Sequence, residues 1–372
     1  MPKENLVICY KQAPVDEVFV QEIREAWPQV NIVNAGQKDV VKALEEADYF
    51  CGHVKVPINW DEIVKIGRLR WIQSSAAGMD WCLVPSVIES NIVITTASGA
   101  LADQVAEHSL ALILTSLRNI VSFFADQFDE EGRFFSKQSG LCPLESGGYR
   151  NFTRLSTGDL TGKTVGIVGF GGVGRRLSQL LAPFRTRILA TDLFPENKPN
   201  HIEELWGPEN LDKLLGESDV VVLCLPLNST TKCMFNAEKF RIMKRGSLFV
   251  NVARGPIVVT GDLIESLKNG KLGGAVVDVT DPEPLPKDHP LWDAPNVLIT
   301  PHVAGQSAVR FNTINRLFLE NIRRRQSGEP FVNRLSDEGK RLGFPLRNGE
   351  TPLWIDITSE HDSLKNIHPR VG

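Results

Sequence analysis

The sequence predicts an α/β protein with two doubly wound parallel sheets. Short apolar runs alternate with polar, helix-length stretches along most of the chain, a pattern typical of βαβ units. The length of 372 residues suggests two domains, because domains usually hold roughly 100–200 residues. A hydrophobic fraction of 42% beside 23% charged residues is ordinary for a globular protein with a buried core.

Charge and composition exclude two kinds of partner. The 41 Lys and Arg residues against 45 Asp and Glu give a formal net charge of −4, whereas a dedicated nucleic-acid binder would be strongly basic. No run is apolar for the ~20 residues that a membrane span needs. The six cysteines have no C-x-x-C spacing and the N-terminus resembles no export signal, so we expect a cytoplasmic protein without nucleic-acid or membrane partners.

The first hundred residues predict a five-stranded sheet. Its strands are expected at Leu6–Tyr10, Val30–Val33, Tyr49–Cys51, Trp71–Gln73 and Val93–Thr95. The helices between them are expected at Val15–Trp27, Lys38–Ala47 and Trp60–Gly67. A long amphipathic helix then covers Ala100–Ile120, where apolar residues recur at helical spacing among charged ones. The Gly- and Ser-rich stretch 132–158 predicts a surface loop.

The second half predicts a second, larger sheet. Its six strands are expected at Thr164–Gly169, Ile188–Thr191, Val220–Leu225, Leu248–Val252, Gly274–Asp278 and Val297–Thr300. Six strands with helices between them are typical of a full dinucleotide-binding domain. One more helix is expected over Ala308–Arg325, and the polar residues 344–372 read as a C-terminal tail.

The strongest local motif is the run Gly169-Phe170-Gly171-Gly172-Val173-Gly174 between a strand and the predicted helix Arg175–Ala182. In this context G-x-G-x-x-G is the dinucleotide fingerprint. The first glycine permits the tight turn, the second lets the backbone approach a pyrophosphate, and the third lets the helix pack against its strand. The candidate cofactor contacts in this loop are Gly169, Gly171, Gly172, Val173 and Gly174. A plain glycine turn is the alternative.

Asp192 ends the next predicted strand, at the distance expected for a carboxylate that binds the adenosine ribose hydroxyls. A 2′-phosphate at this place would be repelled, and neither Leu193 nor Phe194 supplies an arginine to offset the repulsion. The sequence therefore favours NAD over NADP.

Three later strands end beside charged residues. Arg254 follows one strand, Asp278 ends the next and is followed by Glu283, and His302 follows the last. Ligands of open α/β sheets bind outside the carboxyl ends of the strands, so these residues are expected around one crevice.

The segments "NVARG", "VVDV…DPEP" and "TPHVAG", in this order after "GFGGVG", resemble the NAD-dependent D-isomer-specific 2-hydroxyacid dehydrogenase family over roughly Leu6 to Gly343. The resemblance implies hydride transfer between a 2-oxoacid and a D-2-hydroxyacid, with NAD as cofactor. It implies a central Rossmann domain inserted in a discontinuous, flavodoxin-like substrate-binding domain, and a homodimer formed through Ala100–Ile120. The implied boundaries are 1–99 plus 304–343 for the substrate domain, 100–303 for the NAD domain and 344–372 for the tail.

Carried over residue by residue, the resemblance implies Arg254, Glu283 and His302 as the catalytic set. His302 would exchange a proton with the substrate oxygen as hydride moves. Glu283 would hold the other imidazole N–H and fix its tautomer. Arg254 offers a planar fork for the substrate carboxylate and a charge that polarises the carbonyl.

The resemblance also implies the remaining contacts. Asp278 would anchor the nicotinamide carboxamide, and the N–H groups of Ala77 and Gly78 would receive the substrate carboxylate beside Arg254 and His302. The other implied cofactor contacts are Leu225, Pro226, Val252 and Ala253. His53 or Lys55 could read the variable end of the substrate, although an exposed charge is an equal alternative. The remaining histidines lack metal-ligand spacing, and we expect no metal site.

The sequence leaves the substrate and the exact function open. The leading substrates are 3-phosphoglycerate, hydroxypyruvate and glyoxylate, and the sequence does not choose among them. The rival function is an NAD(H)-sensing binding protein or corepressor on the same fold, which would keep the three catalytic residues. A weaker alternative is a redox enzyme for a phosphite-like substrate. Turnover measurements discriminate among these functions.

Overall fold

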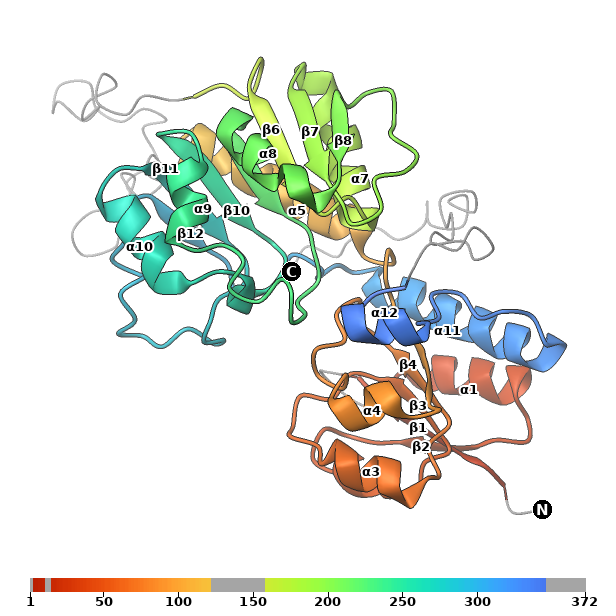
Figure 1. Ribbon diagram of the computed structural model, residues 1–372. Helices are drawn as coiled ribbons and strands as arrows, with labels where there is room; N and C mark the ends of the chain where they lie inside the picture. The colour runs from red at the N-terminus through yellow and green to blue at the C-terminus, as the bar shows by residue number, and fades with distance from the viewer. Residues whose placement is uncertain (1–2, 11–14, 122–157, 346–372) are drawn as a thin grey trace, which may run out of the picture. The chain divides into compact units, whose positions relative to one another are not determined.

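The computed structural model describes residues 3–10, 15–121 and 158–345, and these form two compact units (Figure 1). The first unit contains the described chain up to Ala102, the short stretch Pro226–Thr231 and the described chain from Gly305. The second unit contains Asp103–Leu225, as far as it is described, and Lys232–Ala304. The predicted loop 132–158 and tail 344–372 lie almost entirely outside the described residues. No helix within the described ranges is both long and apolar enough to cross a bilayer.

The first unit is built on a five-stranded parallel sheet of order β2-β1-β3-β4-β5. The strands are β1 Asn5–Cys9, β2 Asn31–Asn34, β3 Tyr49–Gly52, β4 Trp71–Ser74 and β5 Val93–Thr95. All five predicted strands are confirmed within one or two residues. Every residue of β1 after the first, and every residue of β3 and β4, is half-buried or buried, because helices cover both faces of the sheet.

Two helices cover one face of this sheet and four short ones cover the other (Figure 1). The first pair is α1 Glu17–Ala26 and α11 Arg310–Ser327; the second group is α2 Val40–Glu45, α3 Trp60–Ile66, α4 Pro85–Glu89 and α12 Asp337–Leu342. In α11, Ile314, Leu317, Phe318 and Ile322 recur at helical spacing and are buried. Phe318 lies edge-on to Phe19 of α1, with ring centroids 6.3 Å apart. The sequence did not predict α4 or α12, which have five and six residues.

The second unit is built on a seven-stranded parallel sheet of order β12-β11-β10-β9-β6-β7-β8. The strands are β6 Thr164–Val168, β7 Arg187–Thr191, β8 Glu204–Trp206, β9 Val220–Leu223, β10 Ser247–Asn251, β11 Leu272–Val277 and β12 Val297–Ile299. The expectation of six strands was wrong by one: β8 has three residues at the sheet edge and, among the described strands, pairs only with β7. Strand order reverses between β6 and β9, which marks the usual position of a nucleotide crevice.

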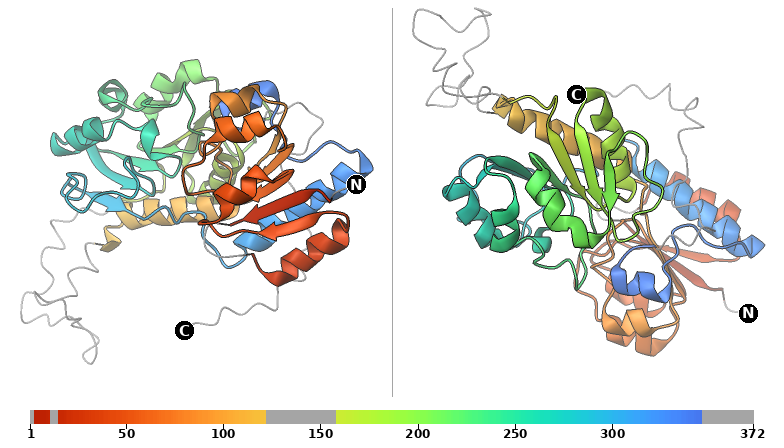
Figure 2. Two further views of the ribbon diagram at one scale, coloured as in Figure 1. Left: turned by 90° about the horizontal axis from the view of Figure 1, so that it is seen from below. Right: turned by 45° about the horizontal axis from the view of Figure 1, so that its top comes forward.

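Helices also cover both faces of the second sheet (Figure 2). One face carries α5 Ala102–Leu117 and α7 Gly172–Leu181; the other carries α8 Leu211–Glu217, α9 Ala237–Ile242 and α10 Thr260–Lys268. Val165 and Ile167 of β6 pack in one cluster with residues of α5 and α7, whereas a Cβ at Gly166 would point at α8. The predicted α/β class with two parallel, doubly wound sheets is confirmed. Five of the six cysteines lie among the described residues, and all five are thiols without a disulfide.

Candidate active site

The glycine loop after β6 is shaped by two of its glycines. Gly169 has a φ of +94°, and a Cβ there would lie 2.6 Å from the carbonyl oxygen of Cys224. A Cβ on Gly174 would overlap the carbonyl oxygen of Gly169. No described atom lies within 4 Å of the Cβ position of Gly171. The fold therefore needs glycine at the first and last positions, and the middle position faces open space.

The same loop presents N–H groups that suit an anion. The helix predicted from Arg175 begins three residues earlier, at Gly172, and runs for ten residues. Among the described residues, the N–H groups of Gly171, Gly172 and Val173 have no acceptor. Unpaired N–H groups at a helix N-terminus, together with the helix dipole, favour a phosphate group. A dinucleotide pyrophosphate fits this loop.

We expect Gly174→Ala to lower the stability of the protein and Gly171→Ala to lower its affinity for NADH. The Gly174→Ala methyl group collides with backbone and should destabilise the protein by about 1–3 kcal/mol. Alanine at position 171 fits the backbone φ of −75° and the open surroundings, so the thermal unfolding midpoint of the cofactor-free protein should not change. Its methyl group would nevertheless occupy the phosphate's place and raise the Kd for NADH by about tenfold or more. NADH fluorescence titration and thermal unfolding measure both effects; wild-type affinity in Gly171→Ala would contradict the phosphate site.

Asp192 is tied to the glycine loop. Val168 of β6 and Thr191 of β7 are in register, so the ends of these strands lie side by side. Asp192 Oδ2 accepts the N–H of Phe170 at 2.6 Å, and Oδ1 accepts the N–H of Phe194 at 3.0 Å. Each oxygen keeps a second lone pair for a ribose hydroxyl.

Arg175 is a neighbour of this site that the sequence motifs did not reveal. Its guanidinium lies over the ring of Phe170, 4.8 Å from the centroid, and donates to the carbonyl oxygens of Glu196 and Asn197, both at 3.0 Å. Arg175 thereby joins the start of α7 to the segment that follows Asp192.

The carboxyl ends of β10, β11 and β12 are level with one another. Asn251 pairs with Val277, and Val277 pairs with Ile299, so the residues that follow each strand leave the sheet at the same edge. Val252 and Ala253 directly follow β10, and Leu225 lies two residues after the end of β9. Leu225 belongs to the second unit, whereas Pro226 belongs to the first.

Arg254 sits in a turn that Asn251 holds. The Asn251 side chain accepts the N–H of Ala253 and donates to the carbonyl oxygen of Arg254, both at 3.0 Å. Arg254 Nη1 donates to the carbonyl oxygen of Ala253 at 2.8 Å. Arg254 as a whole residue is half-buried, beside the end of β10.

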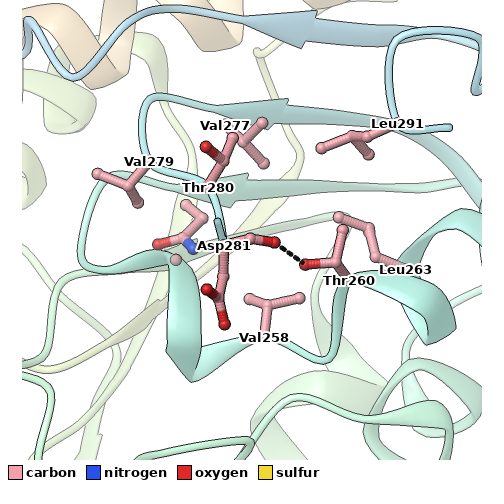
Figure 3. Close-up of a pocket in the computed structure, with 10 residues that line it drawn as sticks. Val258, Thr260, Leu263, Val277, Val279, Thr280, Asp281 and Leu291 are labelled. Carbon is pink, nitrogen blue, oxygen red and sulfur yellow. Dashed lines mark hydrogen bonds between the residues drawn. The ribbon is translucent and has the colours of Figure 1, made fainter. Parts of the chain in front are cut away.

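Gly255 brings the Arg254 turn against the loop that carries Glu283. A Cβ on Gly255 would overlap the carbonyl group of Thr280. The Thr260 hydroxyl also donates to the carbonyl oxygen of Asp281, at 3.2 Å (Figure 3). The small pocket in Figure 3 lies beside this contact and is lined mainly by apolar side chains; Arg254, Glu283 and His302 do not line it. The sequence motifs did not reveal that Gly255 and Thr260 support these two loops.

His302 and Glu283 form a hydrogen-bonded pair. His302 Nδ1 lies 2.7 Å from Glu283 Oε1, and their side chains are 33% and 38% exposed. A carboxylate can only accept here, so Nδ1 carries a proton. Within the described residues His302 Nε2 has no hydrogen-bond partner. The pair can therefore present Nε2 to a substrate as a proton donor or acceptor.

Asp278 lies beneath the His302 loop and is 1% exposed. Its Oδ1 accepts the Thr300 hydroxyl at 2.6 Å and the N–H of Val303 at 2.9 Å, and its Oδ2 accepts the N–H of Ala304 at 3.0 Å. Burial alone raises the pKa of the Asp278 carboxyl, but hydrogen bonds from His108, Thr300 and the two N–H groups hold it below its usual range. The family resemblance implies that Asp278 anchors the nicotinamide carboxamide, and that role stays a prediction. In the structure the Asp278 carboxylate fastens the His302 loop.

The remaining candidates lie in the first unit, in the turn after β4. Within the described residues the N–H groups of Ala77 and Gly78 have no acceptor, and Ala77 is exposed. Two adjacent N–H groups suit a carboxylate, and their role stays a prediction. His53 packs against Trp81, with ring centroids 5.1 Å apart, and Lys55 is exposed. No group of three or more His, Cys, Asp or Glu side chains in the described chain is arranged to hold a metal ion.

The family profile described as "D-isomer specific 2-hydroxyacid dehydrogenase, NAD binding domain" matches residues 110–304. The chain belongs to the D-isomer specific 2-hydroxyacid dehydrogenase family. The resemblance drawn from the sequence motifs is thus confirmed, and with it an oxidoreductase that acts on CH–OH groups with NAD(P).

Relatives agree with this assignment over most of their length. A glyoxylate reductase of Aeropyrum pernix is 33% identical over 268 residues, which cover 72% of this chain and 76% of that protein. A glycerate dehydrogenase of Methylorubrum extorquens is 28% identical over 296 residues, covering 79% and 87%. The D-isomer specific 2-hydroxyacid dehydrogenase of Xanthobacter autotrophicus Py2, solved in complex with NADPH and MES, matches with a TM-score of 0.68 and 27% identity, covering 91% of this chain and 99% of that one.

Proposed function

We propose that the protein reduces a small 2-oxoacid, of the size of glyoxylate or hydroxypyruvate, to its 2-hydroxyacid with NADH. The observation that carries the proposal is the His302–Glu283 pair, whose Nδ1–Oε1 distance is 2.7 Å, at the sheet edge from which Arg254 also emerges. The names of the Aeropyrum and Methylorubrum relatives, a glyoxylate reductase and a glycerate dehydrogenase, support the substrate size.

Each proposed role follows from the chemistry of the side chain. The reduced nicotinamide, when bound, supplies the hydride. His302 Nε2 gives a proton to the carbonyl oxygen in reduction and takes the hydroxyl proton in oxidation. Glu283 holds Nδ1–H, which keeps the imidazole oriented and fixes its tautomer. Arg254 binds the carboxylate with a planar pair of N–H groups and polarises the adjacent carbonyl.

The choice of NAD over NADP rests on Asp192, which stands beside the glycine loop through its bond to Phe170 N–H. Since like charges brought together cost several kcal/mol, this carboxylate should disfavour a 2′-phosphate. The homodimer implied by the family resemblance stays a prediction.

Asp192→Ala is expected to shift cofactor preference toward NADPH. Losing the carboxylate removes both the ribose contact and the repulsion, so the ratio of kcat/KM for NADH to that for NADPH should fall by at least about tenfold. The matched control is Asp293→Ala, which removes an exposed carboxylate of the same unit. A ratio that is equal in the wild-type protein and Asp192→Ala would contradict the assignment.

The proposed function is tested by following NADH absorbance with glyoxylate, hydroxypyruvate, pyruvate and phenylpyruvate, and with 3-phosphoglycerate plus NAD in reverse. We expect a kcat of about 1–10³ s⁻¹ on glyoxylate or hydroxypyruvate. Tight NADH binding without turnover on the whole panel would overturn the proposal and favour an NAD(H)-sensing protein.

A further inference from the structure

Three successive N–H groups of the His302 loop are bound by one residue. The carbonyl oxygen of Asp278 accepts the N–H of His302 at 2.7 Å, and its carboxylate accepts those of Val303 and Ala304 at 2.9 and 3.0 Å. His302 has a φ of +53°, in the left-handed region that a residue other than glycine seldom adopts. Such a conformation persists only where the surrounding structure stabilises it. Here the three hydrogen bonds to Asp278 stabilise it.

Two side chains fix the Asp278 carboxylate in turn. The Thr300 hydroxyl lies 2.6 Å from Asp278 Oδ1 and 3.2 Å from Nε2 of His108 on α5. His108 Nε2 is also 3.5 Å from Asp278 Oδ1. The Thr300 hydroxyl has a single proton, which it donates in the hydrogen bond to the Asp278 carboxylate. Toward His108 this hydroxyl is therefore a hydrogen-bond acceptor. His108 must therefore carry a proton on Nε2, directed at Thr300 and Asp278.

We propose that Thr300 and His108 are positioning residues for His302, acting through Asp278. Together they hold a buried carboxylate in the one orientation that binds Val303 and Ala304. The His302 backbone, and hence the place of its Nε2, follows from that orientation. All six of these residues belong to the second unit. The inference rests on the proposed function, since positioning matters for a proton transfer at Nε2.

Pairs of substitutions separate this role from simple packing. Thr300→Val keeps the shape and removes the hydroxyl, whereas Thr300→Ser keeps the hydroxyl. His108→Leu removes the donor, whereas His108→Gln places an amide N–H near the position of Nε2. The control is Glu107→Gln, which neutralises the exposed neighbour of His108 on α5.

We expect kcat to fall by on the order of 10²-fold in Thr300→Val and by about tenfold or more in His108→Leu, because small displacements of catalytic groups cost that much. Thr300→Ser and His108→Gln should recover kcat to within about threefold of wild type, with Glu107→Gln unchanged. KM for the 2-oxoacid and the stoichiometry of NADH binding should change little, since the effect lies on the chemical step.

Hydrogen exchange of the amides at residues 302–304 gives a readout independent of turnover. Exchange should accelerate in Thr300→Val and stay at the wild-type rate in Thr300→Ser. Wild-type kcat in Thr300→Val, equal losses in Val and Ser, or unchanged exchange would each overturn the positioning role. A wild-type protein that is inactive on the whole 2-oxoacid panel would instead contradict the proposed function. Accelerated amide exchange in Thr300→Val would then still show that Thr300 stabilises the His302 loop.

Discussion

His302→Ala is expected to lower kcat for 2-oxoacid reduction by about 10²–10⁴-fold while NADH still binds. The reason is that His302 Nε2 is the proposed proton donor, whereas the glycine loop and Asp192 supply the proposed cofactor contacts. Steady-state kinetics give kcat, and NADH fluorescence titration gives the Kd.

A second histidine of the same unit supplies the control. His289 Nδ1 accepts the N–H of Leu291 at 3.1 Å, and His289→Ala should keep the wild-type kcat. A kcat for His302→Ala within about threefold of wild type would refute general acid–base catalysis by this residue.

Gly255→Ala is expected to cost about 10²-fold in kcat/KM, because a misplacement of about 1 Å is enough for such a loss. The added methyl group would overlap the carbonyl of Thr280 and push the Arg254 turn away from the loop that carries Glu283. The substituted protein should still bind NADH, since the glycine loop after β6 is untouched.

Gly261→Ala is the matched control for this substitution. Gly261 lies in α10, and no described atom comes within 4 Å of its Cβ position. Alanine there should keep activity and stabilise the helix by up to about 1 kcal/mol. Equal kinetics for the two variants would show that the contact at Gly255 does not position the site.

The strands were predictable because both sheets are covered on both faces. A doubly covered strand such as β9, with four buried residues, appears in the sequence as an unbroken apolar run. That signal fails for the edge strand β8, whose middle residue alone is buried. The helices α4 and α12, with five and six residues, were not predicted either.

The sequence motifs proposed the residues of the candidate site, but they indicated few of the contacts among these residues. The family resemblance implied the contact between His302 and Glu283, which lie 19 positions apart with β12 between them. No sequence pattern indicated the contact between His108 and Thr300, which lie 192 positions apart. Local patterns carry no information on pairs that only the closed fold brings together. The level ends of β10, β11 and β12 explain why reasoning from strand ends still gathered Arg254, Asp278 and His302 at one edge.

The split composition of the first unit also matters while the chain is being made. Its last strand ends at Thr95, but α11, which covers one face of the sheet, begins at Arg310. At roughly 5–20 residues per second, a ribosome needs about 10–40 s to supply the missing helix. Throughout that interval the apolar side chains that later meet Phe318, among them Phe19 and Trp71, face water or a chaperone. The nascent chain is therefore most exposed to aggregation while its second unit is being synthesised.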